Sequence, residues 1–172
     1  MIHYQYLNSR LLFIGINPHH GSFSRGVPFS NNKMFWYLLS RSGIIRETVN
    51  ELKNDQKLKL MWEEKFNRVY QLGLVNIIER STRDISLLIK GEELPGANNI
   101  NSIIRDHQPA VVCFIGKVTC QKFTALKDVS FGWQPNLYNS KIYVMHSPLR
   151  GEASIRIDDL KIVASVAFHN IQ

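Results

Sequence analysis

Four short apolar runs constrain the fold of this 172-residue chain more than any other feature. Each run is five or six residues long and is predicted to form a buried strand: residues 11–16, 74–78, 110–115 and 141–145. Segments with helical character lie between or after them: about 32–43, one or two helices within 44–70, 98–107, 117–126 and 157–169. This alternation is typical of a parallel sheet with helices on both faces. The sequence therefore predicts an α/β fold with one domain over residues 1–172, a three-layer α/β/α sandwich around a short, mostly parallel central sheet.

The distribution of charge indicates a polyanionic partner. The chain has 21 basic and 14 acidic residues, for a formal net charge of +7. Residues 1–46 carry five basic residues and no acid, and residues 107–151 carry five basic residues and one acid. If folding brings these two windows together, they form one basic face of the kind that binds nucleic acid. The alternative is a chance distribution of solvated lysines and arginines.

Composition limits the class of protein. Apolar residues make up 44% and charged residues 20% of the chain, as in an ordinary soluble domain and unlike a disordered or fibrous protein. No apolar run approaches the ~20 residues of a membrane-spanning helix, and residues 1–6 lack the pattern of a signal peptide. Cys113 and Cys120 lie in apolar surroundings and are predicted to be free, buried thiols. We therefore expect an intracellular protein without membrane association, in the cytoplasm or at the nucleoid if the source is prokaryotic.

Unusual residues follow three of the predicted strands. The first strand ends at Gly15-Ile16-Asn17-Pro18, the third at Gly116-Lys117, and the last at His146-Ser147-Pro148-Leu149. Because ligand sites in such folds lie beyond the carboxyl ends of the strands, we expect these segments to share one site. Residues 17–31, rich in Gly, Ser, Pro and Asn, predict a long loop beside it, and loops of this length are usually functional.

Four ordered blocks of sequence resemble a known family. The first comprises GINP (15–18), GVPF (26–29) and FW (35–36); the others are GLVNIIERST (73–82), HQPAVVCFIGK (107–117) and MHSPLRG (145–151). Together they resemble the mismatch-specific uracil-DNA glycosylase and thymine-DNA glycosylase family of the uracil-DNA glycosylase superfamily. The resemblance extends over about residues 10–170.

The resemblance implies a monofunctional DNA glycosylase of base excision repair. Such an enzyme flips a deaminated or mismatched base out of DNA and hydrolyses its N-glycosidic bond, which leaves an abasic site. Uracil is the first expectation for the base, and thymine opposite guanine the second. The alternative is a catalytically weak or inactive relative that binds lesions without releasing the base. A nucleotide-binding α/β enzyme unrelated to DNA is a third hypothesis, although the common glycine-rich phosphate motifs are absent.

Within the first block, the resemblance assigns four residues around the base. Asn17 corresponds to the asparagine that positions the attacking water, and Phe29 to the ring that stacks on the base. Gly15 and Ile16 belong to the same base-binding segment, where glycine permits close approach of the backbone. His19 departs from the family pattern and is expected at the mouth of the base pocket. The structural alternatives are an Asx turn for Asn17 and core packing for Phe29.

The last block allows two alignments with the second active-site motif. In one, His146 donates a hydrogen bond to the charge that develops on the base. In the other, Met145 takes that place and His146 replaces a proline. Ser147 is a candidate phosphate ligand, and Leu149 with Arg150 is placed to enter the base stack as a wedge.

Gly116 and Lys117 are expected to bind phosphate at a helix N-terminus. No cofactor is required for this hydrolysis. His19 and His20 form a possible metal pair, but no third ligand is evident nearby, so we expect no metal. DNA containing a damaged or mismatched base is the expected partner, and a monomer is the expected state.

Overall fold

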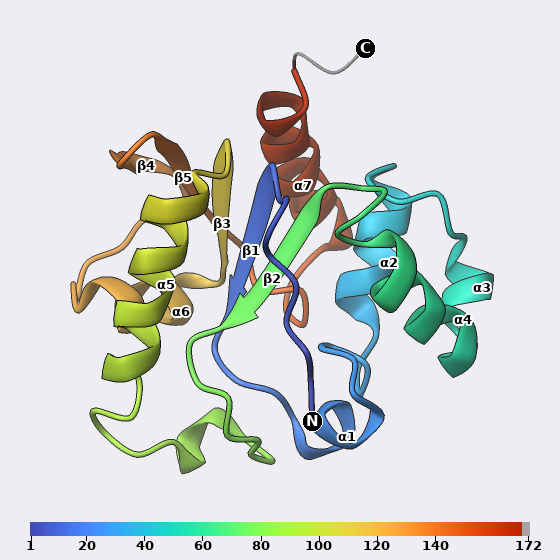
Figure 1. The fold of residues 1–172 in the computed structure, drawn as a ribbon, viewed down its shortest axis with the longest axis horizontal. Coiled ribbons are helices and arrows are strands. Elements are labelled where there is room, and N and C mark those ends of the chain that lie inside the picture. Colours follow the sequence, from blue (N-terminus) through green and yellow to red (C-terminus); the bar gives the residue numbers. More distant parts are fainter. Residues whose placement is uncertain (170–172) are drawn as a thin grey trace.

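A computed structural model describes residues 1–169 of the chain. Within this range, one sheet has the strand order β2-β1-β3-β5-β4, formed by β1 Leu11–Gly15, β2 Leu72–Asn76, β3 Val111–Ile115, β4 Gly132–Leu137 and β5 Ser140–Met145 (Figure 1). The pairs β1–β2, β1–β3 and β3–β5 are parallel, and β4 runs antiparallel to β5. The predicted α/β fold with a mostly parallel central sheet is confirmed.

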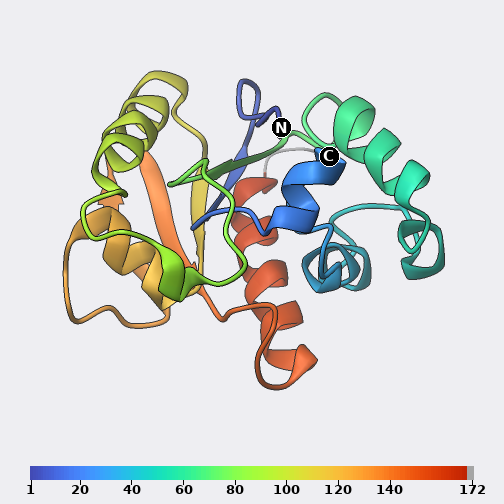
Figure 2. The ribbon, with the colours of Figure 1, turned by 90° about the horizontal axis from the view of Figure 1, so that it is seen from below.

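Helices flank the sheet on both sides (Figures 1 and 2). One side carries α2 Met34–Arg41, α3 Val49–Leu52, α4 Asp55–Leu60, a π-helical turn Met61–Lys65 and α7 Ala153–Ala167; the other carries α5 Leu94–His107 and α6 Lys117–Thr124. The side chains of β1 alternate between the two layers, because successive residues of a strand face opposite ways. Leu11 and Phe13 belong to the core under α2 and α7, whereas Leu12 and Ile14 belong to the core under α5.

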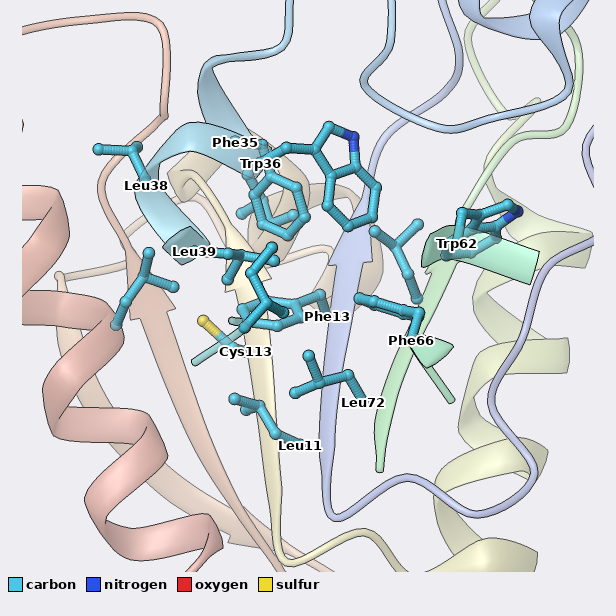
Figure 3. Packing of buried hydrophobic residues seen from close by; sticks show 14 of the residues in the cluster. Leu11, Phe13, Phe35, Trp36, Leu38, Leu39, Trp62, Phe66, Leu72 and Cys113 are labelled. Carbon is cyan, nitrogen blue, oxygen red and sulfur yellow. The ribbon is translucent and has the colours of Figure 1, made fainter. Parts of the chain in front are cut away.

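Aromatic packing in the first core positions part of the site. Trp36, Trp62 and Phe66 are fully buried and pack ring against ring, with centroids 4.9–6.0 Å apart (Figure 3). The indole Nε1 of Trp36 also donates a hydrogen bond of 2.8 Å to the carbonyl of Pro28. The buried indole therefore fixes the backbone immediately before Phe29.

Two connections contain more helix than the sequence predicted. The short helix α1 His20–Arg25 lies within the predicted loop 17–31; His19 begins it and Gly26, at a φ of 72°, ends it. Helix α5 begins at Leu94 rather than at residue 98, with a proline in its first turn, which tolerates the missing N–H. Its Gly96 lies so close to the sheet that a Cβ there would stand 1.6 Å from the carbonyl oxygen of Ile77.

The strands and the last helix also differ from the prediction. Strand β2 covers residues 72–76 rather than 74–78, and β4 was not predicted. Pro135 and Asn136 weaken the strand signal of β4, but an edge strand tolerates proline. Helix α7 begins four residues before its predicted start and ends at Ala167. No helix among residues 1–169 is long and apolar enough to cross a bilayer.

Candidate active site

The carboxyl ends of four strands meet at one edge of the sheet. Gly15 pairs with Asn76 at the ends of β1 and β2, and Ile115 pairs with Met145 at the ends of β3 and β5. The amide of Gly116 donates to the carbonyl of Met145 at 3.0 Å. Neighbouring strands are about 4.8 Å apart, so the residues that follow these ends lie in one row. The segments that the sequence analysis expected to share a site are therefore brought to the same edge.

Asn17 is held by its amide nitrogen. Nδ2 donates to Oγ1 of Thr82 at 2.8 Å, to the carbonyl of Arg80 at 3.1 Å and to the carbonyl of Pro18 at 3.3 Å. Oδ1 accepts no hydrogen bond from the residues that the structure describes. The carboxamide orientation is thus set by the segment after β2, and its oxygen is left to accept a hydrogen bond from a water molecule. The same hydrogen bonds join the segment after β1 to the segment after β2. Asn17 can therefore stabilise the loops through Nδ2 and still bind a water molecule through Oδ1.

Gly15 and Phe29 meet at the carboxyl end of β1. A Cβ on Gly15 would stand 3.2 Å from Cζ of Phe29 and 2.4 Å from Oδ1 of Asn76, so the absence of a side chain is required there. Phe29 has a φ of 55°, which bulky residues rarely adopt, and its ring packs at 4.8 Å on the buried ring of Phe35. The carbonyls of Gly15 and Ile16 accept hydrogen bonds from the amides after β2, so Ile16 contributes backbone to the site.

Asn76 is a candidate site residue that was not predicted from the sequence. Asn76 is 8% exposed, and its Nδ2 donates to the hydroxyl of Tyr4 at 2.9 Å. Oδ1 is buried and has no hydrogen-bond partner among residues 1–169. Burial raises the pKa of Tyr4, and the negative charge of Glu79 raises it further, so the hydroxyl stays protonated. A buried amide oxygen without a partner, beside Gly15 and close to Phe29, is suited to accept an N–H from a ligand. The sequence feature that could have identified Asn76 is its position as one polar residue inside an apolar strand.

His19 and His20 serve the start of α1. Nδ1 of His19 accepts from the amide of Gly21 at 3.0 Å, so in the neutral ring the proton is on Nε2. Nδ1 of the exposed His20 lies 2.8 Å from Oγ of Ser81. No group of three or more His, Cys, Asp or Glu that could hold a metal ion occurs among residues 1–169. The side chain of His19 therefore caps a helix through one nitrogen and presents only the other to a ligand.

His146, directly after β5, contacts two side chains of other segments, Asp159 and Phe131. Its backbone N–H and its Nδ1 both lie 2.8 Å from Oδ2 of Asp159, a residue of α7. The ring stacks on Phe131 with centroids 3.7 Å apart and an angle of 23°. Met145, by contrast, is fully buried in the core. Of the two residues that compete for the second-motif role, His146 is the one that presents a polar group at the edge.

Arg156 of α7 braces the loop that follows. It is 3% exposed, its Nε donates to the carbonyl of Ser147, and its Nη1 donates to the carbonyl of Gly151 at 2.7 Å. Within the braced loop, Leu149 is 61% exposed and Arg150 is exposed as well. A fixed loop with a protruding apolar side chain is the geometry that a wedge requires. Arg156 was not predicted, because nothing in the sequence marks a charged residue for burial.

Gly116 and Lys117 stand at the start of α6, beside the same loop. Gly116 precedes the helix with a φ of 92°, and a Cβ there would lie 4.0 Å from Cβ of Ser147. Nζ of Lys117 lies 4.2 Å from the centroid of the Phe131 ring, a cation–π contact. Free amides of the first helical turn and a lysine thus stand next to Ser147.

Both cysteines are buried free thiols. Burial raises the pKa of Cys113 well above its ordinary value and that of Cys120 to about 11. Neither thiol supplies a thiolate nucleophile at neutral pH.

A comparison with protein families finds one match to most of the chain. The family model of the uracil DNA glycosylase superfamily matches residues 2–153. The match includes β1 to β5 and every site residue described above except Asp159 and Arg156.

Proposed function

The chain belongs to the uracil DNA glycosylase superfamily, and from this premise we propose that it is a monofunctional glycosylase of the mismatch-specific uracil type. Family membership makes it a DNA-binding hydrolase of base excision repair that cleaves N-glycosyl bonds in damaged DNA. The proposal adds the base: uracil, and thymine opposite guanine as the second substrate.

One observation carries the proposal: Oδ1 of Asn17 accepts no hydrogen bond from the described residues, and Asn17 follows Gly15, around which Phe29 and Asn76 lie. A nucleotide turned out of the duplex can stack its base against Phe29 over Gly15. A water that donates a hydrogen bond to Oδ1 of Asn17 then attacks C1′ of the sugar. The bond from C1′ to the base breaks, and the base leaves with the electron pair as an anion. The proton released from the attacking water passes to solvent.

Asn76 supports a choice among bases. Its free Oδ1 can only accept, so it favours a base with an N–H at that position. Uracil and thymine carry this hydrogen at N3. Cytosine has a lone pair at N3, which would face the amide oxygen and leave both acceptors unpaired in a buried place. Unpaired buried groups of this kind discriminate strongly between substrates. Uracil is thereby separated from the cytosine from which deamination produces it.

Residues along the rest of the row suit the DNA backbone and the vacated stack. The amides at the start of α6, Lys117 and Ser147 offer donors and charge for phosphate. Leu149, exposed on the loop that Arg156 braces, can fill the space of the departed base, and Arg150 follows it. Both basic windows of the sequence contribute segments to this edge.

The test is a panel of labelled duplexes, each with one altered base, incubated with excess protein and then cleaved by alkali. We expect cleavage at uracil and an about hundredfold lower rate constant for Asn17→Ala. Asn50→Ala, the same change at an exposed residue of α3, is the matched control and should behave as the wild type.

Three other results would count against the proposal in different ways. Equal rates for Asn17→Ala and the wild type would remove Asn17 from the reaction. Salt-sensitive binding without cleavage of any duplex would favour a lesion-binding relative that does not release the base. Lack of DNA binding would refute the DNA substrate itself.

A further inference from the structure

An exposed tryptophan lies near the candidate site and takes no part in the function proposed above. Trp133 of β4 is 43% exposed, whereas Trp36 and Trp62, the other two tryptophans of the chain, are fully buried. Strand β4 is the outermost strand of the sheet, next to β5 (Figure 1). A large aromatic ring that is partly in solvent offers a face on which a flat ligand can stack.

The indole of Trp133 is held in place by its neighbours. Trp133 pairs with Tyr143 across β4 and β5, and the two rings meet edge to face with centroids 4.9 Å apart. Tyr143 is itself buried, so it supports the indole from the sheet. The side-chain amide of Gln134 donates to the carbonyls of Ser130 and Gly132 and so fixes the backbone that carries the indole. A ring that is fixed before binding loses little conformational freedom when a ligand stacks on it.

Phe131 connects the indole to the proposed DNA-binding edge. Phe131 lies two residues before Trp133, a separation of about 7 Å along an extended chain. Its ring stacks on His146 with centroids 3.7 Å apart, and Nζ of Lys117 lies 4.2 Å from its centroid. Because these contacts occupy the ring of Phe131, the indole of Trp133 is the ring available for stacking. It therefore lies just past the end of the row at which Lys117 and Ser147 are proposed to bind phosphate.

The charge of this part of the chain suits a nucleic acid. Residues 129–151, which include β4, β5 and the loop after them, contain Lys141 and Arg150 and no acidic residue. Proteins bind single strands by combining basic residues with exposed rings, because the cations attract the phosphates and the rings stack on the bases. A paired base inside a duplex has both faces covered by its neighbours and cannot stack on the indole.

We infer that Trp133 binds a base of single-stranded DNA beside the altered nucleotide, so that the protein acts on single strands as well as on duplexes. The inference rests on the proposed function for its account of the altered base, but binding of an undamaged single strand requires no excision. Because β4 lies at one end of the row, nucleotides on only one side of the altered base reach the indole.

The first test is binding of an undamaged oligothymidylate of about ten nucleotides, within the range of known single-strand site sizes. Because Trp36 and Trp62 are buried, quenching of intrinsic fluorescence by the oligonucleotide reports on Trp133. We expect quenching in the wild type, and about 5- to 100-fold weaker binding for Trp133→Leu, measured by anisotropy of the labelled oligonucleotide. Trp133→Phe keeps a ring and should recover most of the affinity. The matched control is Tyr138→Leu, which removes an exposed ring from the turn between β4 and β5 and should bind as the wild type does.

The second test compares single-turnover excision of uracil from a single strand and from a duplex. For the single strand, Trp133→Leu should raise the protein concentration that gives half of the maximal rate by about 5- to 100-fold. The maximal rate constant should not change, because stacking beside the site affects binding and not the bond that breaks. For the duplex, neither quantity should change. Of two strands with uracil near the 5′ end or near the 3′ end, only one should be sensitive to Trp133→Leu.

Several results would overturn the inference. Absence of quenching in the wild type would do so whether or not Trp133→Leu folds, and so would equal affinities of the wild type and a folded Trp133→Leu for the oligonucleotide. Self-association of the wild type without DNA, seen by sedimentation and lost in Trp133→Leu, would assign the indole to a second copy of the chain instead.

The outcomes also separate the inference from the function on which it rests. If the wild type excises no base from any substrate, the proposed function fails. Quenching by the oligonucleotide, together with weaker binding by Trp133→Leu, would still support the stacking site. Excision of uracil with no effect of Trp133→Leu on single strands would overturn the inference and leave the glycosylase proposal intact.

Discussion

The orphaned amide oxygen of Asn76 predicts that stability and activity move in opposite directions. A buried acceptor without a partner costs about 1–3 kcal/mol, whereas the bond from Nδ2 to Tyr4 contributes about 1 kcal/mol. Asn76→Leu keeps the branched shape of the side chain and removes both the unpaired oxygen and the hydrogen bond to Tyr4. It also strands the hydroxyl of Tyr4, so the matching change is Tyr4→Phe. The double variant should therefore be as stable as the wild type, or more stable by up to about 2 kcal/mol.

Excision of uracil by the same variant should fall about 10- to 100-fold, which corresponds to the loss of one hydrogen bond of about 1.5–3 kcal/mol to the substrate. Urea denaturation gives the free energy of unfolding, and single-turnover cleavage of a uracil duplex gives the rate constant. Tyr4→Phe alone is the control, because it leaves Oδ1 of Asn76 in place. A double variant that is less stable than the wild type by more than about 2 kcal/mol, at an unchanged m-value, would refute the reasoning about the unpaired oxygen. A wild-type rate constant would refute its role in base reading.

Three further outcomes follow from the geometry. Gly15→Ala should lower the rate of excision and the denaturation midpoint, because its Cβ would stand 2.4 Å from Oδ1 of Asn76 and displace it. Burial would raise the pKa of Glu47, but hydrogen bonds from Tyr70 and Lys65 lower it below its usual 4.5. The ionised carboxylate therefore contributes fully to the free energy of unfolding above about pH 4.5, and this contribution is lost as the pH falls through the lowered pKa of Glu47. In Glu47→Gln, the free energy of unfolding, measured by urea denaturation, should fall less steeply with decreasing pH than in the wild type. Cys113 should react with a thiol reagent at pH 8 only at the rate of unfolding, since it is buried with a raised pKa.

The elements that could be predicted from the sequence are the strands whose side chains are buried on both faces of the sheet. Strands β1 and β3 are apolar over almost their whole length, and β5 is apolar from Ile142 to Met145; a run of that kind has few alternatives to a central position in a sheet. Strand β4 was missed because its side chains alternate in exposure and its sequence includes a glycine and a proline. Its place at the edge, which makes such residues acceptable, is a property of the tertiary fold.

The arrangement of the candidate site could be predicted in part, for the same reason. Asn17, Gly116 and His146 follow strands, so the rule for strand ends indicated them. Asn76 is the last residue of β2, but the predicted strand ran on to residue 78 and placed it in the interior of the strand. Asp159 and Arg156 act across 13 and 9 residues of chain through the packing of α7, and no local pattern reports that packing.

The strand order has a consequence for how DNA must approach. Asn76, Asn17, Gly116 and His146 follow one another along the edge in the order β2, β1, β3, β5, over a span of about 14 Å. Because these four residues differ, the two ends of the row are chemically distinct. Under the proposed function, a nucleotide whose base lies at the Asn76 end runs its backbone toward the Ser147 end, because the reverse orientation would set phosphate against the ring of Phe29. The two strands of a duplex run in opposite directions, so we expect this row to contact the backbone of the strand that bears the altered base.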